Sequence, residues 1–247
     1  MTDWTPKTNV AEWHITYNCN LRCVGCNRFV GAKRHAPDMT VQDAHEFIRQ
    51  AAEMDWQPEI RILGGEPTLH QDLFEFIELA FAFTGRVKVV PRGYERVRVY
   101  SNGYSQKTIA ILNRIRSEAK AFVPSWAVKR DGSVTFEHID YCIAPRDIGD
   151  TRQPCDFHSA RVGGCGISVD SRGYAVCQTG GAIDEILGLG ARTRTLADLF
   201  DETFAAWQTG LLCSHCGGIW GYRHADKFPI IHGVPMSPRW QKAWHKG

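Results

Sequence analysis

The chain has 247 residues, of which 43% are hydrophobic and 23% charged, and its formal net charge is +2. A chain of this size can bury one substantial core, with room for one large domain or for one domain and a small appendage. A nearly neutral charge demands neither a nucleic-acid arm nor a membrane surface. The first residues hold no apolar signal core and no run reaches transmembrane length, so we expect a cytoplasmic protein with no membrane partner.

Strands and helices are expected to alternate along the first half of the chain. Residues 12–17 alternate and carry β-branched and aromatic side chains, which favours a strand that delivers Cys19 to a loop. Thr40 can cap a helix that runs to about Asp55, because apolar residues recur there at spacings of three and four. The elements expected next are a strand over 60–63, a helix over 71–83, a strand over 97–101 and a helix over 107–117.

This alternation predicts right-handed βαβ crossovers and a parallel sheet. The chain up to about residue 150 has space for roughly six βα units, and not for the eight of a full barrel of about 250 residues. We therefore expect an α/β fold, a partial (βα)6 TIM-like barrel over residues 10–152. Active groups would lie on the loops that follow the carboxyl ends of its strands.

The pattern changes after residue 153. Residues 167–169 and 174–176 flank a turn, which predicts a β-hairpin, and a helix over 196–209 would bring the following cysteines back toward it. We expect a small hairpin and helix domain over 153–223 that carries an auxiliary cluster, and a C-terminal tail over 224–247.

Nine cysteines in a chain without a secretory signal indicate metal-binding thiolates and not a disulfide framework. They fall into a first set, Cys19, Cys23 and Cys26, a second set, Cys165, Cys177, Cys213 and Cys216, and two that stand apart, Cys142 and Cys155.

In the first set, three and then two residues separate successive cysteines, and the set begins just after the end of a predicted strand. A structural zinc site uses four protein ligands, whereas an iron-sulfur cube held by three thiolates keeps one iron open for a substrate or cofactor. The alternative is a structural metal site with a distant fourth ligand such as His14 or His35.

The segment from Tyr17 to Cys23, followed at a distance by the Gly-Gly-Glu-Pro-Thr sequence at 64–68, resembles the radical S-adenosylmethionine (radical SAM) superfamily. The resemblance implies a [4Fe-4S] cluster whose open iron chelates SAM. It also implies that one-electron cleavage of SAM gives a 5′-deoxyadenosyl radical that abstracts hydrogen from a substrate. Such chemistry needs an electron donor such as flavodoxin or ferredoxin.

The resemblance also implies a set of cofactor-binding residues. The 64–68 segment would receive the methionine amino group, and the pair Ser101 and Asn102 would contact the ribose or carboxylate of the cofactor. Without the resemblance, both segments would be ordinary turns. The residue before the third cysteine is usually aromatic in this superfamily but is Gly25 here, so the adenine contact must come from elsewhere. The implied residues are Gly64, Gly65, Glu66, Pro67, Thr68, Ser101 and Asn102.

The second cysteine set has two interpretations. Four thiolates can hold a zinc ion that braces the small domain, or a fully ligated second [4Fe-4S] cluster that carries an electron. Beside a radical SAM core, a hairpin thiol pair with a later Cys-x2-Cys resembles the shortened auxiliary-cluster domain called Twitch, found in small aminocyclitol-dehydrogenase-like members. We therefore favour the cluster.

Two features remain. Cys142 is interpreted as a small buried hydrophobe, whereas Cys155 lies in a polar stretch and is a candidate substrate-facing group or hydrogen donor. Basic residues at 86–98 and 239–246 keep nucleic acid open as a partner, although a solvated face and a docking tail are the commoner explanation.

The sequence thus favours a radical SAM enzyme acting on a small-molecule or nucleotide-like substrate. Its first candidate reaction is dehydrogenation, in which the auxiliary cluster accepts the second electron. The alternative is a rearrangement or carbon-carbon bond formation on a nucleotide, a nucleic-acid base or an amino-acid conjugate. From another class, a zinc-bearing binding module without catalysis stays open.

Overall fold

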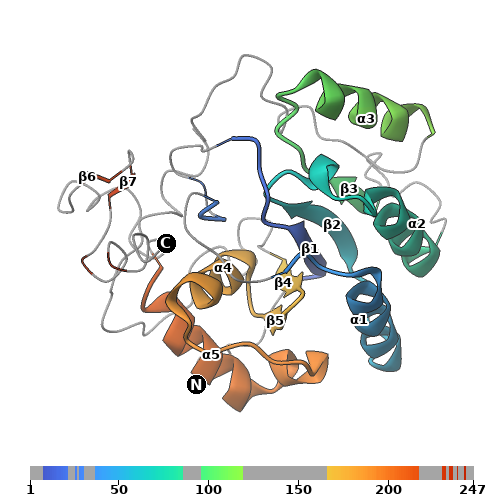
Figure 1. Cartoon of the computed structure of the whole chain (residues 1–247). Coiled ribbons are helices and arrows are strands. Elements are labelled where there is room, and N and C mark those ends of the chain that lie inside the picture. Colours follow the sequence, from blue (N-terminus) through green and yellow to red (C-terminus); the bar gives the residue numbers. More distant parts are fainter. Residues whose placement is uncertain are drawn as a thin grey trace.

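The computed structural model describes residues 8–21, 26, 28–30, 37–85, 96–118 and 166–216, and, toward the C-terminus, 230–231, 234–235, 238 and 242 (Figure 1). In chain order the elements are β1 (Val10–Thr16), α1 (Val41–Glu53), β2 (Glu59–Gly64), the 3₁₀ turn η1 (Pro67–Leu69), α2 (Leu73–Thr84), β3 (Val97–Val99), α3 (Gln106–Ser117), β4 (Ile167–Asp170), β5 (Gly173–Ala175), α4 (Gln178–Leu187), the 3₁₀ helix η3 (Leu196–Phe200), α5 (Glu202–Cys213), β6 (Ile230–Ile231) and β7 (Val234–Pro235).

The main sheet has the strand order β3-β2-β1-β4-β5. β1 pairs in parallel with β2 and with β4, β2 pairs in parallel with β3, and only β5 runs antiparallel to its neighbour. Three successive βα units, β1-α1, β2-α2 and β3-α3, supply three of the five strands of this sheet. The predicted α/β class with a parallel sheet is confirmed, and the arrangement is consistent with a partial TIM-like barrel.

One face of the sheet forms the core. Strand register places alternate apolar residues in two rows across β3, β2, β1 and β4, and all eight side chains are buried. Trp13 at the centre packs edge-on against Phe47 of α1 and Phe76 of α2, with ring centroids 5.7 and 6.1 Å apart. The two rows are Val97, Ile60, Ala11 and Ile167, and Val99, Ile62, Trp13 and Val169.

The helices begin where the sequence supplies caps. Thr40 and Asp43 form a reciprocal capping box at the start of α1, because the Thr40 hydroxyl accepts from Asp43 N and the Asp43 carboxylate accepts from Thr40 N at 2.8 Å. Ser105 caps α3 because its hydroxyl accepts from Thr108 N. The predicted helices and strands of the first half are confirmed with shifts of one or two residues.

The second half differs from expectation in three respects. The predicted hairpin is confirmed as β4-β5, but β4 also pairs with β1, so the hairpin extends the main sheet. The helix expected over 196–209 is instead η3 followed by α5, because Asp201 caps a new helix by accepting from Phe204 N at 2.8 Å. Helix α4 was not predicted, and it lies with α5 beside the hairpin (Figure 1).

The predicted domain boundaries stay a prediction, because residues 119–165 lie outside the described part of the chain. The fourth, fifth and sixth βα units of the expected barrel would fall within the same stretch.

Candidate functional site

Three loops meet at one edge of the sheet. Cys19 follows β1, the 64–68 segment begins at the end of β2, and Ser101 follows β3. Since these strands are parallel, their carboxyl ends lie at the same edge, which is where α/β folds bind ligands.

The glycine pair joins the first two of these loops. Gly65 N donates to Thr16 O at 2.7 Å, and Glu66 N donates to Asn18 O at 2.8 Å. A Cβ on Gly64, whose φ is +137°, would lie 2.0 Å from Thr16 O, and a Cβ on Gly65 would lie 2.2 Å from Asn18 O. The two glycines therefore allow a close approach of the backbone that leads into the cysteine loop.

Glu66 links the second loop to the third. Its side chain is fully buried, and one carboxylate oxygen accepts from Thr68 N at 3.1 Å and from Ser101 Oγ at 2.8 Å. The other oxygen accepts from Asn102 N at 2.8 Å. Burial raises the pKa of Glu66 above its ordinary value, while these donors oppose the rise. The Glu66 carboxylate, in the segment expected to receive the methionine amino group, is therefore an internal acceptor that holds the predicted cofactor segments together.

The rest of that segment is also inward-facing. Pro67 is the first residue of η1, and Thr68 donates its hydroxyl to Glu66 at 2.7 Å. Both side chains are buried.

Cys19 is half-buried and receives hydrogen bonds at its sulfur. Leu21 N lies 3.4 Å from Cys19 Sγ, and the Asn102 amide nitrogen lies 3.6 Å from it. Donors directed at a sulfur stabilise its thiolate, which is the form that binds metal. The residues present therefore suit an iron-sulfur ligand at Cys19. Cys26 is half-buried too, and Cys23 lies outside the described residues.

The face of the sheet opposite the core is polar, which sequence analysis did not anticipate. Glu12 on β1 is buried and pairs with Arg28 at 3.2 Å and with Arg61 on β2 at 3.4 Å. Glu59 pairs with Arg61 at 2.7 Å and with Arg98 on β3 at 3.0 Å. Burial raises the pKa of Glu12, although Arg28 and Arg61 lower it. Arg98, one of the basic residues considered for nucleic acid, belongs to this partly buried network.

Three of the four cysteines of the second set, Cys177, Cys213 and Cys216, lie within the described residues. Cys177 caps α4, and its sulfur accepts from Gly180 N at 3.2 Å. Cys213 ends α5, and Cys216 N donates to Cys213 O at 3.0 Å. A Cβ on Gly180 would lie 3.3 Å from Cys177 Sγ and 2.9 Å from the Leu212 side chain. The start of α4 and the end of α5 are therefore close together.

Within the described ranges no group of three or more histidine, cysteine, aspartate or glutamate side chains is arranged to hold a metal ion. One cysteine of each predicted set, Cys23 and Cys165, lies outside those ranges, as do the unassigned Cys142 and Cys155.

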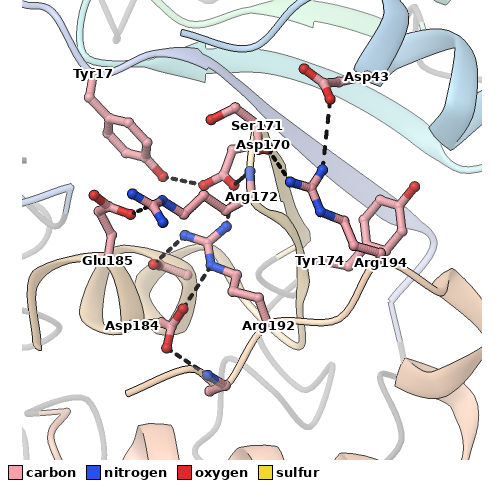
Figure 2. Close-up of polar contacts among 12 residues, drawn as sticks. Tyr17, Asp43, Asp170, Ser171, Arg172, Tyr174, Asp184, Glu185, Arg192 and Arg194 are labelled. Atoms are coloured by element: carbon pink, nitrogen blue, oxygen red, sulfur yellow. Dashed lines mark hydrogen bonds and ion pairs between the residues drawn. The ribbon is translucent and has the colours of Figure 1, made fainter. Parts of the chain in front are cut away.

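A buried charged network connects the two cysteine regions (Figure 2). Tyr17, two residues before Cys19, donates its hydroxyl to Asp170 at 2.7 Å. Arg192 lies between Asp170, to which it donates, and Asp184 of α4, whose carboxylate is 3.3 Å away. The loop that leads to Cys19 is thereby tied to the helix that Cys177 caps.

Comparison with known proteins defines the class. Residues 13–120 match the model of the radical SAM superfamily, and the expected resemblance is thereby confirmed over this part of the chain. The superfamily is one of enzymes, and a domain of this kind implies a [4Fe-4S] cluster and SAM as cofactors.

The individual relatives match over shorter lengths. A mycofactocin maturase of Mycolicibacterium smegmatis is 35% identical over 33% of this chain and 20% of its own length. An AdoMet-dependent heme synthase of Oleidesulfovibrio alaskensis is 28% identical over 38% of this chain and 24% of its own length. The matches thus span a quarter or less of these relatives.

A solved structure of BtrN in an open conformation has a TM-score of 0.45 and 14% identity, covering 84% of this chain and 87% of that one. Within the described residues no helix has the length and apolar character needed to span a bilayer.

Proposed function

We propose that this chain is a radical SAM enzyme that removes hydrogen from a polar small-molecule substrate. Cys19, Cys23 and Cys26 would hold a [4Fe-4S] cluster with one open iron. With SAM bound, the reduced cluster would supply the electron that cleaves SAM and so generates a hydrogen-abstracting radical. The observation that carries the proposal is the meeting of the three predicted cofactor loops through the contacts of Asn18, Glu66 and Asn102.

The chain's own groups would bind and orient SAM at this edge. Because the Glu66 carboxylate is already saturated by internal donors, the acceptors for the methionine ammonium group would be backbone carbonyls of the Gly64–Gly65 turn. Ser101 and Asn102 would contact the ribose or carboxylate. The polar face of the sheet opposite the core, with Glu12, Arg61 and their partners, supports a polar substrate and not an apolar one.

We propose further that Cys165, Cys177, Cys213 and Cys216 hold a second [4Fe-4S] cluster. In a dehydrogenation the substrate loses one hydrogen atom to the radical, then one electron to this cluster and one proton to a base. The nearness of Cys177 to the end of α5 supports a shared site. Cys155 stays the first candidate for a substrate-facing hydrogen donor if the reaction is instead a rearrangement.

The metal content and the product mass test these proposals. The triple Cys19, Cys23 and Cys26 to Ala variant should retain roughly four irons with matching sulfide. Stoichiometric zinc without sulfide would show that the second set is a zinc site. With candidate substrates, a loss of two hydrogens for each SAM consumed supports dehydrogenation, whereas an unchanged mass moves the preference to rearrangement.

A further inference from the structure

The side chain of Asn102 has a fixed direction. Its backbone N donates to Glu66 Oε2 at 2.8 Å, and its Oδ1 accepts from Tyr104 N at 2.9 Å. A backbone N–H can only donate, so the amide oxygen must face Tyr104 and the amide nitrogen must face the other way.

That nitrogen faces the first cysteine loop. Asn102 Nδ2 lies 3.6 Å from Cys19 Sγ and 2.7 Å from Asn20 Oδ1. An amide group has two N–H donors, so both bonds can form together. Cys19 Sγ is also approached by Leu21 N, but a backbone donor is present whatever the side chain, whereas the donor of Asn102 depends on that residue.

Hydrogen bonds to the sulfur ligands are among the factors that set the reduction potential of an iron-sulfur cluster. A cluster gains negative charge when it is reduced. A donor directed at one of its thiolates therefore stabilises the reduced state more than the oxidised state, and it raises the midpoint potential.

We propose that Asn102 tunes the cluster held by the first cysteine set, through its bond to Cys19, so that the cluster is reduced more easily. This inference rests on the proposed function of that set. It gives Asn102 a role that does not require SAM, beside the cofactor contact that the sequence predicted.

The test is a redox titration of the full-length, cluster-loaded protein followed by electron paramagnetic resonance without SAM. The signal of the first cluster is the one that changes when SAM is added to a separate sample. In Asn102→Ser the hydroxyl can still accept from Tyr104 N but is too short to reach Cys19. We expect the ratio of reduced to oxidised cluster at a given potential to fall about tenfold, which equals about 59 mV for one electron.

Ser105→Ala is the matched control. This variant removes the hydroxyl that accepts from Thr108 N at the end of the same loop, and it leaves the Asn102 donor and its Glu66 anchor in place. Its midpoint potential should equal that of the wild type. An equal fall in both variants would mean that general disturbance of the loop, and not the Asn102 donor, sets the potential, and it would overturn the proposal.

An unchanged midpoint in Asn102→Ser would also overturn it. If that variant loads no cluster, Asn102→Asp decides, because it keeps the acceptor for Tyr104, lacks the donor and adds a negative charge. Its midpoint must then be lower than in the wild type, and an unchanged value refutes the inference. A wild-type protein without any SAM-responsive cluster signal would instead refute the proposed function itself.

Discussion

Gly65→Ala should destabilise the protein by crowding the entrance to the cysteine loop. The added Cβ would lie 2.2 Å from Asn18 O and 2.8 Å from Tyr17 O, well inside the 3.0 Å that real contacts of this kind keep. Overpacking costs about 1–3 kcal/mol, and the upper end applies because backbone atoms cannot rotate away. For a protein of this size about 3 kcal/mol lowers Tm by roughly 6–12 °C.

The assay is anaerobic thermal unfolding of the cluster-free protein, followed by measurement of iron bound after reconstitution. Gly210→Ala in α5 is the matched control, because a Cβ there meets no atom within 4 Å. That change should raise stability by about 0.5–1 kcal/mol, since alanine is the better helix former. A Gly65→Ala protein that unfolds at the wild-type temperature and binds the wild-type amount of iron would refute the steric argument.

Three further changes test the structure. Burial raises the pKa of the Glu66 carboxyl above 4.5, so the folded protein keeps the carboxyl proton to a higher pH than the unfolded chain does. The stability that this group contributes at low pH is lost as the pH rises through the folded pKa. The fall in Tm above pH 4.5 should therefore be shallower in Glu66→Gln than in the wild type. Arg192→Met leaves two buried aspartates without their cation and should cost about 3–5 kcal/mol in chemical denaturation. Arg49→Met, at an exposed pair, should leave the denaturation midpoint close to that of the wild type. Thr40→Ala removes one half of the α1 capping box, and a loss of about 1 kcal/mol is expected; a loss near zero would show that this cap does not stabilise the fold.

The strands and helices of the first half, and the β4-β5 hairpin, were predictable because their signals are local. The Thr40 cap, the apolar spacing behind it and the turn after β4 each lie within a few residues of the element they define. The loops that follow the strands could also be placed at one edge, since parallel pairing fixes where the carboxyl ends lie.

Helix α4 was missed because Gly180 and Gly181 lie in its first turn, where each lowers helix propensity by about 1 kcal/mol. The structure explains the glycines by packing. A Cβ on Gly181 would lie 2.4 Å from Ser168 Oγ on β4, and one on Gly180 would meet Leu212 on α5. Neither contact can be deduced before the neighbouring elements are known.

The burial of Glu66 was missed for a related reason. Two of its donors, Ser101 and Asn102, lie 35 and 36 residues further along the chain. The same holds for the Glu12–Arg61 pair, whose members are 49 residues apart. The sequence indicated which segments would meet at the site, but the direction of each side chain depends on strand register.

Formation of 5′-deoxyadenosine tests the central claim most directly. The reconstituted wild-type protein, reduced anaerobically in the presence of SAM, should release 5′-deoxyadenosine. Cys23→Ala should release none, because two thiolates are too few to hold the cube with its open iron, whereas Cys142→Ala should behave as the wild type. Cleavage of SAM by Cys23→Ala at the wild-type rate, or no cleavage by an iron-loaded wild-type protein, would contradict the account.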